Sequence, residues 1–259
     1  MWVLVIVAAL LVGVLLGFGL GRGTGQAAPH AQPTASGPTA SVDASTPPSV
    51  SAAPPALEPV EPVPSTPQAA EPADATALAR ERLDRLAIVD GHSDLPYDRA
   101  RFGQAWADVD RNGCDTRNDV LGQDLLDPVF KEGTNDCKVR SGTLIDPYDG
   151  RRVEFASGGE TSILVQIDHV VALGWAWRHG ADAWTDERRT QFANDPVNLA
   201  AASQETNQEK SASGPSTWLP AVPELRCLYV ENWIEALDAY ALGVNAADRS
   251  AAEAVLEAC

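Results

Sequence analysis

Positive charge is scarce in this sequence of 259 residues, which has 19 Lys and Arg side chains against 36 Asp and Glu, a net charge of −17. Residues 1–73 hold only one Arg and four carboxylates, so most of the acidic excess lies in residues 74–259. Because a basic surface is what normally attracts a polyanion, this composition excludes long-range attraction as the means of binding one. Any such binding would require a local basic patch or bound cations.

Charge is also missing from the N-terminus, where no charged side chain precedes Arg22. Residues 1–20 are an apolar run, and about 20 such residues at helical rise cross a bilayer core. A signal peptide would normally carry a basic n-region, which this run lacks. We therefore expect residues 1–22 to be an uncleaved transmembrane anchor. A signal peptide cut near Gly25, Ala27 and Ala28 is the alternative.

Large apolar side chains are rare from residue 23 to residue 73, where Pro, Ala, Ser and Thr dominate. Such a segment cannot bury enough surface to offset the entropy of ordering it, so we expect a disordered linker. A linker after an anchor suits a domain held outside the cell. Arg22 argues weakly for the opposite orientation, because basic residues tend to flank the cytoplasmic side. We expect an extracellular location, either membrane-anchored or secreted.

The four cysteines include no C-x-x-C pair, which argues against a structural zinc site. An even number of cysteines behind an export-like N-terminus indicates two disulfides. The pairing of neighbours in sequence, Cys114 with Cys137 and Cys227 with Cys259, is one of three possibilities. The alternative is four free thiols in a cytoplasmic enzyme.

Residues 74–259 have the segregated helices and strands of an α+β domain. Apolar spacing and capping residues predict helices at 76–89, near 97–106, at 119–126, around 175–180, from Ser203 to the Gly214-Pro215 stop, and at 229–242. Strands are expected at 143–150 and 151–155, and the strongest strand signal is the β-branched run at 162–171.

The candidate catalytic and metal-binding residues occur in the order Asp168-His169, Asn198, then Asn207 and Lys210. Neighbours on a strand point to opposite faces, so Asp168 and His169 can meet at one site only where the strand ends or bulges. Asn207 and Lys210 are three residues apart, which places both on one face of a helix. The expected elements follow one another as a strand, a connection and a helix, which is the order found in the ββα-metal motif.

These residues and several other stretches resemble the HNH (His-Asn-His) endonuclease family, in particular a branch of secreted or anchored bacterial nucleases. The matching stretches are Tyr97 to Trp106, Cys114 to Leu121, Gly142 to Leu144, Asp146 to Tyr148, Asp168 to Leu173, Phe192 to Leu199 and Trp218 to Pro220. One departure is Ser211-Ala212, where Gly-Asp is expected. It bears on the end of the helix and not on the ligands.

The resemblance implies a ββα-metal core embedded in additional helices, and a role for each polar residue. Asp168 and Asn207 would bind one divalent metal, Mg²⁺ first and Mn²⁺ second. His169 would be the general base that takes a proton from water. Asn198 would position the imidazole through hydrogen bonds, and Lys210 would neutralise charge on the phosphoryl group.

Three arginines are candidates for binding substrate phosphates, with Arg117 first and Arg99 and Arg101 after it. A structural ion pair is the alternative for each. A second motif overlaps this region, because Asp108, Asp110, Asn112, Gly113 and Asp119 follow an EF-hand spacing. We expect an Asx-rich turn that orients Arg117, with a calcium site as the alternative.

The resulting hypothesis is a metal-dependent endonuclease that hydrolyses DNA, with RNA as a second substrate and with little sequence specificity. The alternative is a non-catalytic extracellular module that binds a polymer through its tryptophans. A cytoplasmic restriction-type nuclease is a third reading, and it would require free cysteines.

Overall fold

The computed structural model describes residues 72–259. The predicted anchor at 1–22 and all but the last two residues of the predicted linker at 23–73 lie outside these residues. Within the described part, no helix is both long and apolar enough to span a membrane.

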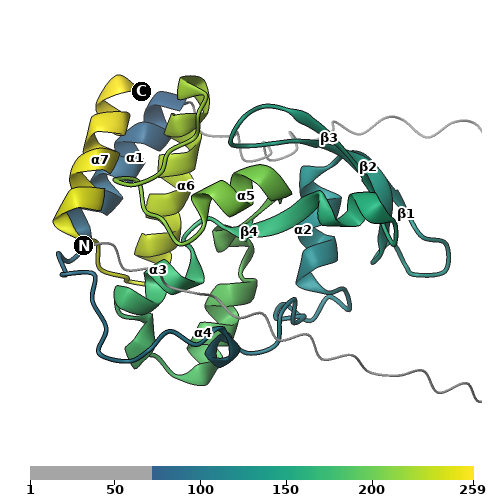
Figure 1. The fold of residues 1–259 in the computed structure, drawn as a ribbon, viewed down its shortest axis with the longest axis horizontal. Helices are drawn as coiled ribbons and strands as arrows, with labels where there is room; N and C mark the ends of the chain where they lie inside the picture. The colour runs from purple at the N-terminus through teal and green to yellow at the C-terminus, as the bar shows by residue number, and fades with distance from the viewer. Residues whose placement is uncertain (1–71) are drawn as a thin grey trace, which may run out of the picture. The chain divides into compact units, whose positions relative to one another are not determined.

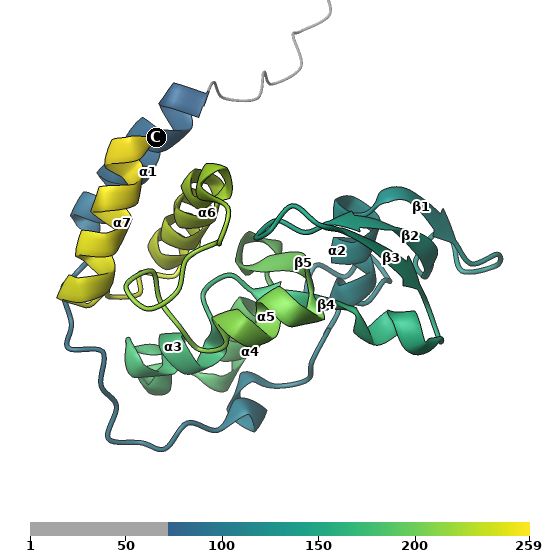
Figure 2. The same ribbon diagram turned by 45° about the horizontal axis from the view of Figure 1, so that its top comes forward.

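Three helices from the two ends of the described chain pack side by side (Figures 1 and 2). They are α1 (Pro72–Arg85), α6 (Arg226–Ala239) and α7 (Ala246–Ala258). Leu83, Trp233 and Leu256 are buried between them. The disulfide Cys227–Cys259 joins the start of α6 to the residue after α7, as in one of the three possible pairings. The helix α7 was not predicted from the sequence, and α1 ends four residues earlier than predicted.

A three-stranded antiparallel sheet lies apart from this helical group (Figure 1). Its order is β1 (Leu126–Phe130), β2 (Val139–Ile145) and β3 (Arg152–Ala156), and α2 (Thr116–Asp124) packs against it. The second disulfide is Cys114–Cys137, so the expectation of two disulfides is confirmed, the pairing is that of neighbours in sequence, and the reading with free thiols is wrong. The strand β1 was not predicted, and its sequence Leu-Asp-Pro-Val-Phe contains a proline, which is rare inside strands.

The centre of the fold is an antiparallel hairpin followed directly by a helix. The hairpin consists of β4 (Val165–His169) and β5 (Leu199–Ser203), and the helix is α5 (Gln204–Lys210). Two helices, α3 (Leu173–Arg178) and α4 (Asp186–Asn194), lie in the connection between the strands. The sequence did not predict β5, because the segment Leu-Ala-Ala-Ala-Ser has no β-branched residue. The expected α+β class is confirmed.

The helix predicted near 97–106 does not form. Only a 3₁₀ turn, η1 (Arg99–Phe102), is present. The chain leaves the helical region at Gly103, where φ is +77°, and again at Trp106, where φ is +61°. A helix cannot continue through residues with positive φ, so the apolar spacing here reflects a loop packed on the core.

The helix α5 begins as predicted and ends earlier. Ser203 caps it by accepting a hydrogen bond from the Thr206 amide. It ends at Lys210, because Ser211 adopts φ 49° and ψ −131° and breaks the helical repeat before the predicted Gly214-Pro215 stop. Ser211 stands where the family resemblance leads us to expect glycine, and its backbone conformation is one that favours glycine.

Ser211→Gly is expected to stabilise the protein. Relief of a strained positive φ, about 1–3 kcal/mol, exceeds the extra entropy that glycine loses on folding, about 0.5–1 kcal/mol. The net gain of about 1 kcal/mol corresponds to a rise in Tm of about 2–4 °C, measurable by differential scanning calorimetry. Ser213→Gly is the matched control, because Ser213 is not among the residues with positive φ. A fall in Tm for Ser211→Gly would contradict the argument.

Candidate active site

A pocket of about 330 Å³ opens where β4 ends beside α5 and the start of α3. The polar and charged side chains in its lining are Tyr97, Arg99, Asp168, His169, Arg178, Asn207 and Ser211. The end of β4 therefore brings Asp168 and His169 to one site, as the motif requires. Asn207 joins them from α5, while Lys210, Asn198, Arg101 and Arg117 do not line the pocket.

The imidazole of His169 is buried, and the backbone fixes its orientation. Its Nε2 lies 2.9 Å from the carbonyl oxygen of Ala193, in the last turn of α4. A carbonyl only accepts hydrogen bonds, so Nε2 is assigned the proton and Nδ1 keeps its lone pair. The indole of Trp106 lies nearly parallel to the imidazole, with a centroid distance of 6.1 Å and an interplanar angle of 14°.

Asn198 holds the backbone next to His169 and does not contact the imidazole, contrary to the expectation. Its side chain accepts a hydrogen bond from the Val171 amide at 2.7 Å and donates one to the Val171 carbonyl at 3.2 Å. Its own carbonyl accepts the Val170 amide at 2.9 Å. These bonds fix the turn that follows β4, so Asn198 positions His169 through the main chain.

Burial lowers the pKa of His169 to about 3. The hydrogen bond to Ala193 opposes this shift, and the positive charges of Arg99 and Lys210 add to it. Removing an imidazolium from water disfavours the charged form, so the ring is neutral in the folded protein at physiological pH. A neutral imidazole with an available Nδ1 is the state that accepts a proton.

The same shift makes stability depend on pH. The unfolded chain takes up a proton at His169 below about pH 6.5, while the folded chain does so only near pH 3. The contribution of the neutral His169 to the free energy of unfolding is fully present above about pH 6.5. Below that pH it falls by about 1.4 kcal/mol per pH unit. His169→Gln is expected to reduce the slope of the free energy of unfolding against pH between about pH 6.5 and pH 4, measured by urea denaturation. The exposed His92→Gln is the control, and an unchanged slope for His169→Gln would contradict this account.

Asp168 and Lys210 form a buried ion pair. The ammonium nitrogen of Lys210 lies 3.1 and 3.0 Å from the two carboxylate oxygens and donates to the His169 carbonyl at 2.7 Å. Tyr148 donates its hydroxyl to the same carboxylate at 2.6 Å. Lys210 has no exposed surface, and Asp168 is 4% exposed. Lys210 therefore contacts Asp168, and not the phosphoryl group that the sequence analysis assigned to it.

Burial raises the pKa of Asp168, although the Lys210 charge and the Tyr148 hydroxyl act in the opposite direction. Burial, and the nearby carboxylate of Asp168, also raise the pKa of Tyr148 well above its ordinary value. Tyr148 therefore stays protonated and remains a hydrogen-bond donor. Together Tyr148 and Lys210 fix both oxygens of Asp168 in place.

Asn207 is oriented by a residue of the neighbouring strand. Its Nδ2 donates to Oε1 of Gln166 at 2.8 Å, which leaves the amide oxygen as the atom without a partner among the described residues. The start of its helix is fixed by the buried Asp146, which accepts hydrogen bonds from the Ser203 amide at 2.6 Å and the Thr206 hydroxyl at 2.8 Å. Asp146 thus couples the β2–β3 turn to α5.

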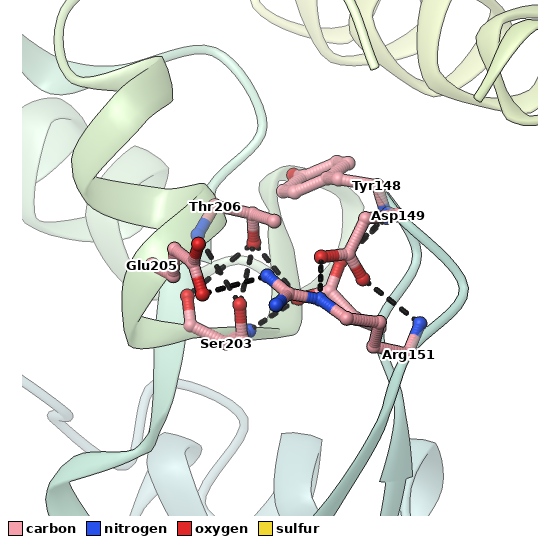
Figure 3. Close-up of polar contacts among 7 residues, drawn as sticks. Tyr148, Asp149, Arg151, Ser203, Glu205 and Thr206 are labelled. Atoms are coloured by element: carbon pink, nitrogen blue, oxygen red, sulfur yellow. Dashed lines mark hydrogen bonds and ion pairs between the residues drawn. The ribbon is translucent and has the colours of Figure 1, made fainter. Parts of the chain in front are cut away.

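A second contact between the same elements lies at the surface. The guanidinium of Arg151 binds Asp149 within the turn and Glu205 on α5, the latter at 2.7 Å (Figure 3). Tyr148 belongs to this turn, so the hydroxyl that binds Asp168 and the helix that carries Asn207 are held by one network.

Residues 115–250 match the family described as the C-terminal domain of GmrSD restriction endonucleases. The chain belongs to this HNH-type nuclease family. An uncharacterized secreted protein of Arthroderma benhamiae is 37% identical over 165 residues, which cover 63% of this chain and 76% of that protein. No solved structure matches the chain. These matches establish the family, and not the narrower bacterial branch expected from the sequence.

In this GmrSD-type domain, the three candidate arginines differ in position. Arg117 lies outside the pocket, and its guanidinium donates to the carbonyls of Ser162 and Val165 at the other end of β4 from His169. Burial lowers its pKa. Arg101 lies over the Trp177 ring, with its nearest carboxylate 3.9 Å away. Only Arg99 of the three lines the pocket.

The acidic loop before α2 forms the expected Asx-rich turn. Asp108 accepts hydrogen bonds from the amides of Asn112 and Gly113, and Asp110 accepts from Asn112. The side chain of Asn112 also donates to Asp119. In residues 72–259 no group of three or more His, Cys, Asp or Glu side chains is arranged to hold a metal.

The oxygens at the pocket are of the type that hard divalent cations prefer. They come from the carboxylate of Asp168 and the amide of Asn207. A carboxylate has about four lone-pair positions, so the bonds from Tyr148 and Lys210 leave acceptor capacity. The donor set fits a cation that keeps several waters, as Mg²⁺ does.

The sequence analysis missed four contributors to the site: Tyr148, Gln166, the Ala193 carbonyl and Arg178. Tyr148 and Ala193 lie in stretches that carried the family resemblance, which was the available signal. Gln166 and Arg178 act through contacts between distant segments, and no local pattern indicates them.

Proposed function

We propose that the chain is a metal-dependent HNH endonuclease that hydrolyses phosphodiester bonds of DNA with little sequence specificity, with RNA as a second candidate substrate. The observation that carries this proposal is one pocket lined by a neutral imidazole, a carboxylate and an amide oxygen. Membership of a restriction-endonuclease family supports the nuclease class.

In the proposed reaction, Nδ1 of His169 accepts a proton from the attacking water, while the Ala193 carbonyl keeps the other ring proton on Nε2. Asp168 and Asn207 would hold one Mg²⁺ or Mn²⁺ ion, which when bound stabilises negative charge on the leaving 3′-oxygen. Tyr148 and Lys210 keep the Asp168 carboxylate in one orientation. Cleavage of the bond between the phosphorus and the 3′-oxygen leaves a 5′-phosphate on the other product.

We also propose an extracellular location. Two disulfides are typical of proteins in oxidising compartments, and the similar Arthroderma protein is named as secreted. The anchor at residues 1–22 remains a prediction. A domain outside the cell would meet nucleic acid of varied sequence, which agrees with low sequence specificity.

Plasmid cleavage by the full-length chain tests the proposal, with Mg²⁺, Mn²⁺ or EDTA in the buffer. We expect cleavage with metal and none with EDTA. Asn207→Ala should reduce the rate by about 100-fold or more, since even the partners of metal ligands contribute about 10–100-fold. Asn112→Ala, in the Asx turn, is the control and should cleave normally.

The outcomes separate the two functional classes. Absence of cleavage with every metal, on DNA and on RNA, would favour the non-catalytic polymer-binding module. Cleavage that survives EDTA would contradict the role given to Asp168 and Asn207.

A further inference from the structure

We propose that Arg99 and Arg178 form a phosphate-binding subsite on two walls of the His169 pocket, which holds the phosphodiester group of a nucleic acid strand. The inference rests on the proposed function and specifies how an acidic protein can bind a polyanion. Nothing in the sequence pattern pointed to Arg178.

The two arginines reach the pocket from unrelated segments. Arg99 is an exposed residue that opens η1, and Arg178 is the last residue of α3. Arg178 donates to the Ala212 carbonyl at 3.2 Å, which holds its side chain along the loop that follows α5. Both residues line the same pocket as His169 and Asn207.

The charge of this pocket is opposite to that of the chain. Its lining includes one carboxylate, Asp168, and that charge is matched by the buried Lys210. Within the described residues, neither Arg99 nor Arg178 forms an ion pair with a carboxylate. Two guanidinium charges are therefore left to attract an anion, and their planar forks match phosphate oxygens.

Two other concave surfaces of the described chain differ from it in charge. One near α4 is lined by Asp108, Asp110, Asp186, Glu187 and Asp195 against Arg111 alone. Another contains Arg151 and Arg152, but both are paired with carboxylates on the β2–β3 hairpin or α5. The His169 pocket is thus a place where positive side chains outnumber negative ones in an acidic chain.

Binding without turnover tests the subsite. The probe is a short, fluorescein-labelled single-stranded DNA oligonucleotide of mixed sequence, titrated in EDTA with the full-length chain and followed by fluorescence anisotropy. Arg178→Gln and Arg99→Gln should each weaken binding by about tenfold, the effect of losing one charged hydrogen bond. The slope of log affinity against log salt should fall by about 0.7 per lost phosphate contact. Arg178→Lys should restore part of the affinity.

Arg140→Gln is the matched control, because Arg140 is an exposed arginine on β2 outside the pocket and the substitution changes the net charge equally. Equal losses in Arg140→Gln and Arg178→Gln would overturn the subsite in favour of a general charge effect. Wild-type affinity in both pocket variants, with cleavage intact, would overturn the subsite but not the nuclease. A selective loss of binding in a chain that does not cleave would support the subsite and reject the catalytic proposal.

Discussion

Lys210→Met is expected to lower the free energy of unfolding by about 3–5 kcal/mol, the effect of removing one partner from a buried ion pair. The Lys210 ammonium has no exposed surface and contacts both oxygens of Asp168 and the carbonyl of His169. Methionine preserves most of the side-chain volume but leaves the Asp168 carboxylate with Tyr148 as its main partner. Urea denaturation in EDTA measures the change without interference from bound metal.

The double variant Lys210→Met/Asp168→Asn separates the ion pair from simple packing. The amide that replaces the Asp168 carboxylate would carry no charge and could still accept the Tyr148 hydrogen bond, so the double variant should be more stable than Lys210→Met alone. The double-mutant cycle then gives the coupling energy between the two residues. A loss below about 1 kcal/mol in the single variant would contradict a fully buried pair, because exposed ion pairs contribute at this level.

His169→Ala is expected to reduce phosphodiester cleavage by about 100- to 10,000-fold, the usual contribution of a general base. The Ala193 carbonyl and the Trp106 ring hold the imidazole so that one nitrogen remains available. Among the described residues, no other histidine lines the pocket to replace it. The measurement is the initial rate of plasmid nicking with Mg²⁺, and Tm is recorded for each variant to exclude unfolding.

His92→Ala is the matched control for this prediction. His92 is an exposed histidine in the loop after α1, and its side chain contacts Asp94. Its loss should leave the nicking rate unchanged. If His169→Ala cleaved as fast as His92→Ala while both remained folded, the water would have to be activated by another group.

Much of the candidate site was predictable because the motif residues are close in sequence to the strand and helix that carry them. The β-branched run before Asp168-His169 predicted β4, and the Ser203 cap predicted α5 with Asn207 on it. The presence of two disulfides followed from the even number of cysteines, whereas the structure decided which of the three possible pairings forms.

The failures have a common physical cause. Asn198 and Lys210 were assigned to the imidazole and the substrate from the family resemblance, and Arg117 to the substrate from the match between its guanidinium and phosphate. Each one instead satisfies a buried group of the fold: the carbonyls near the start of β4, the backbone of Val171, and the carboxylate of Asp168. A polar side chain binds whatever partner the fold places within reach, and buried partners take precedence because they have no water.

The sequence by itself determined the α+β class, the export-like cysteine pattern, the β4 and α5 elements, and the choice of Asp168, His169 and Asn207 as candidate site residues, which line one pocket. These depend on local spacing and on side-chain type. Only the tertiary structure decided that β5 pairs with β4, that Tyr148 and Lys210 hold Asp168, and that Arg178 lines the same pocket. Those relations join segments far apart in the chain, and they follow from packing and from the need to pair buried polar groups.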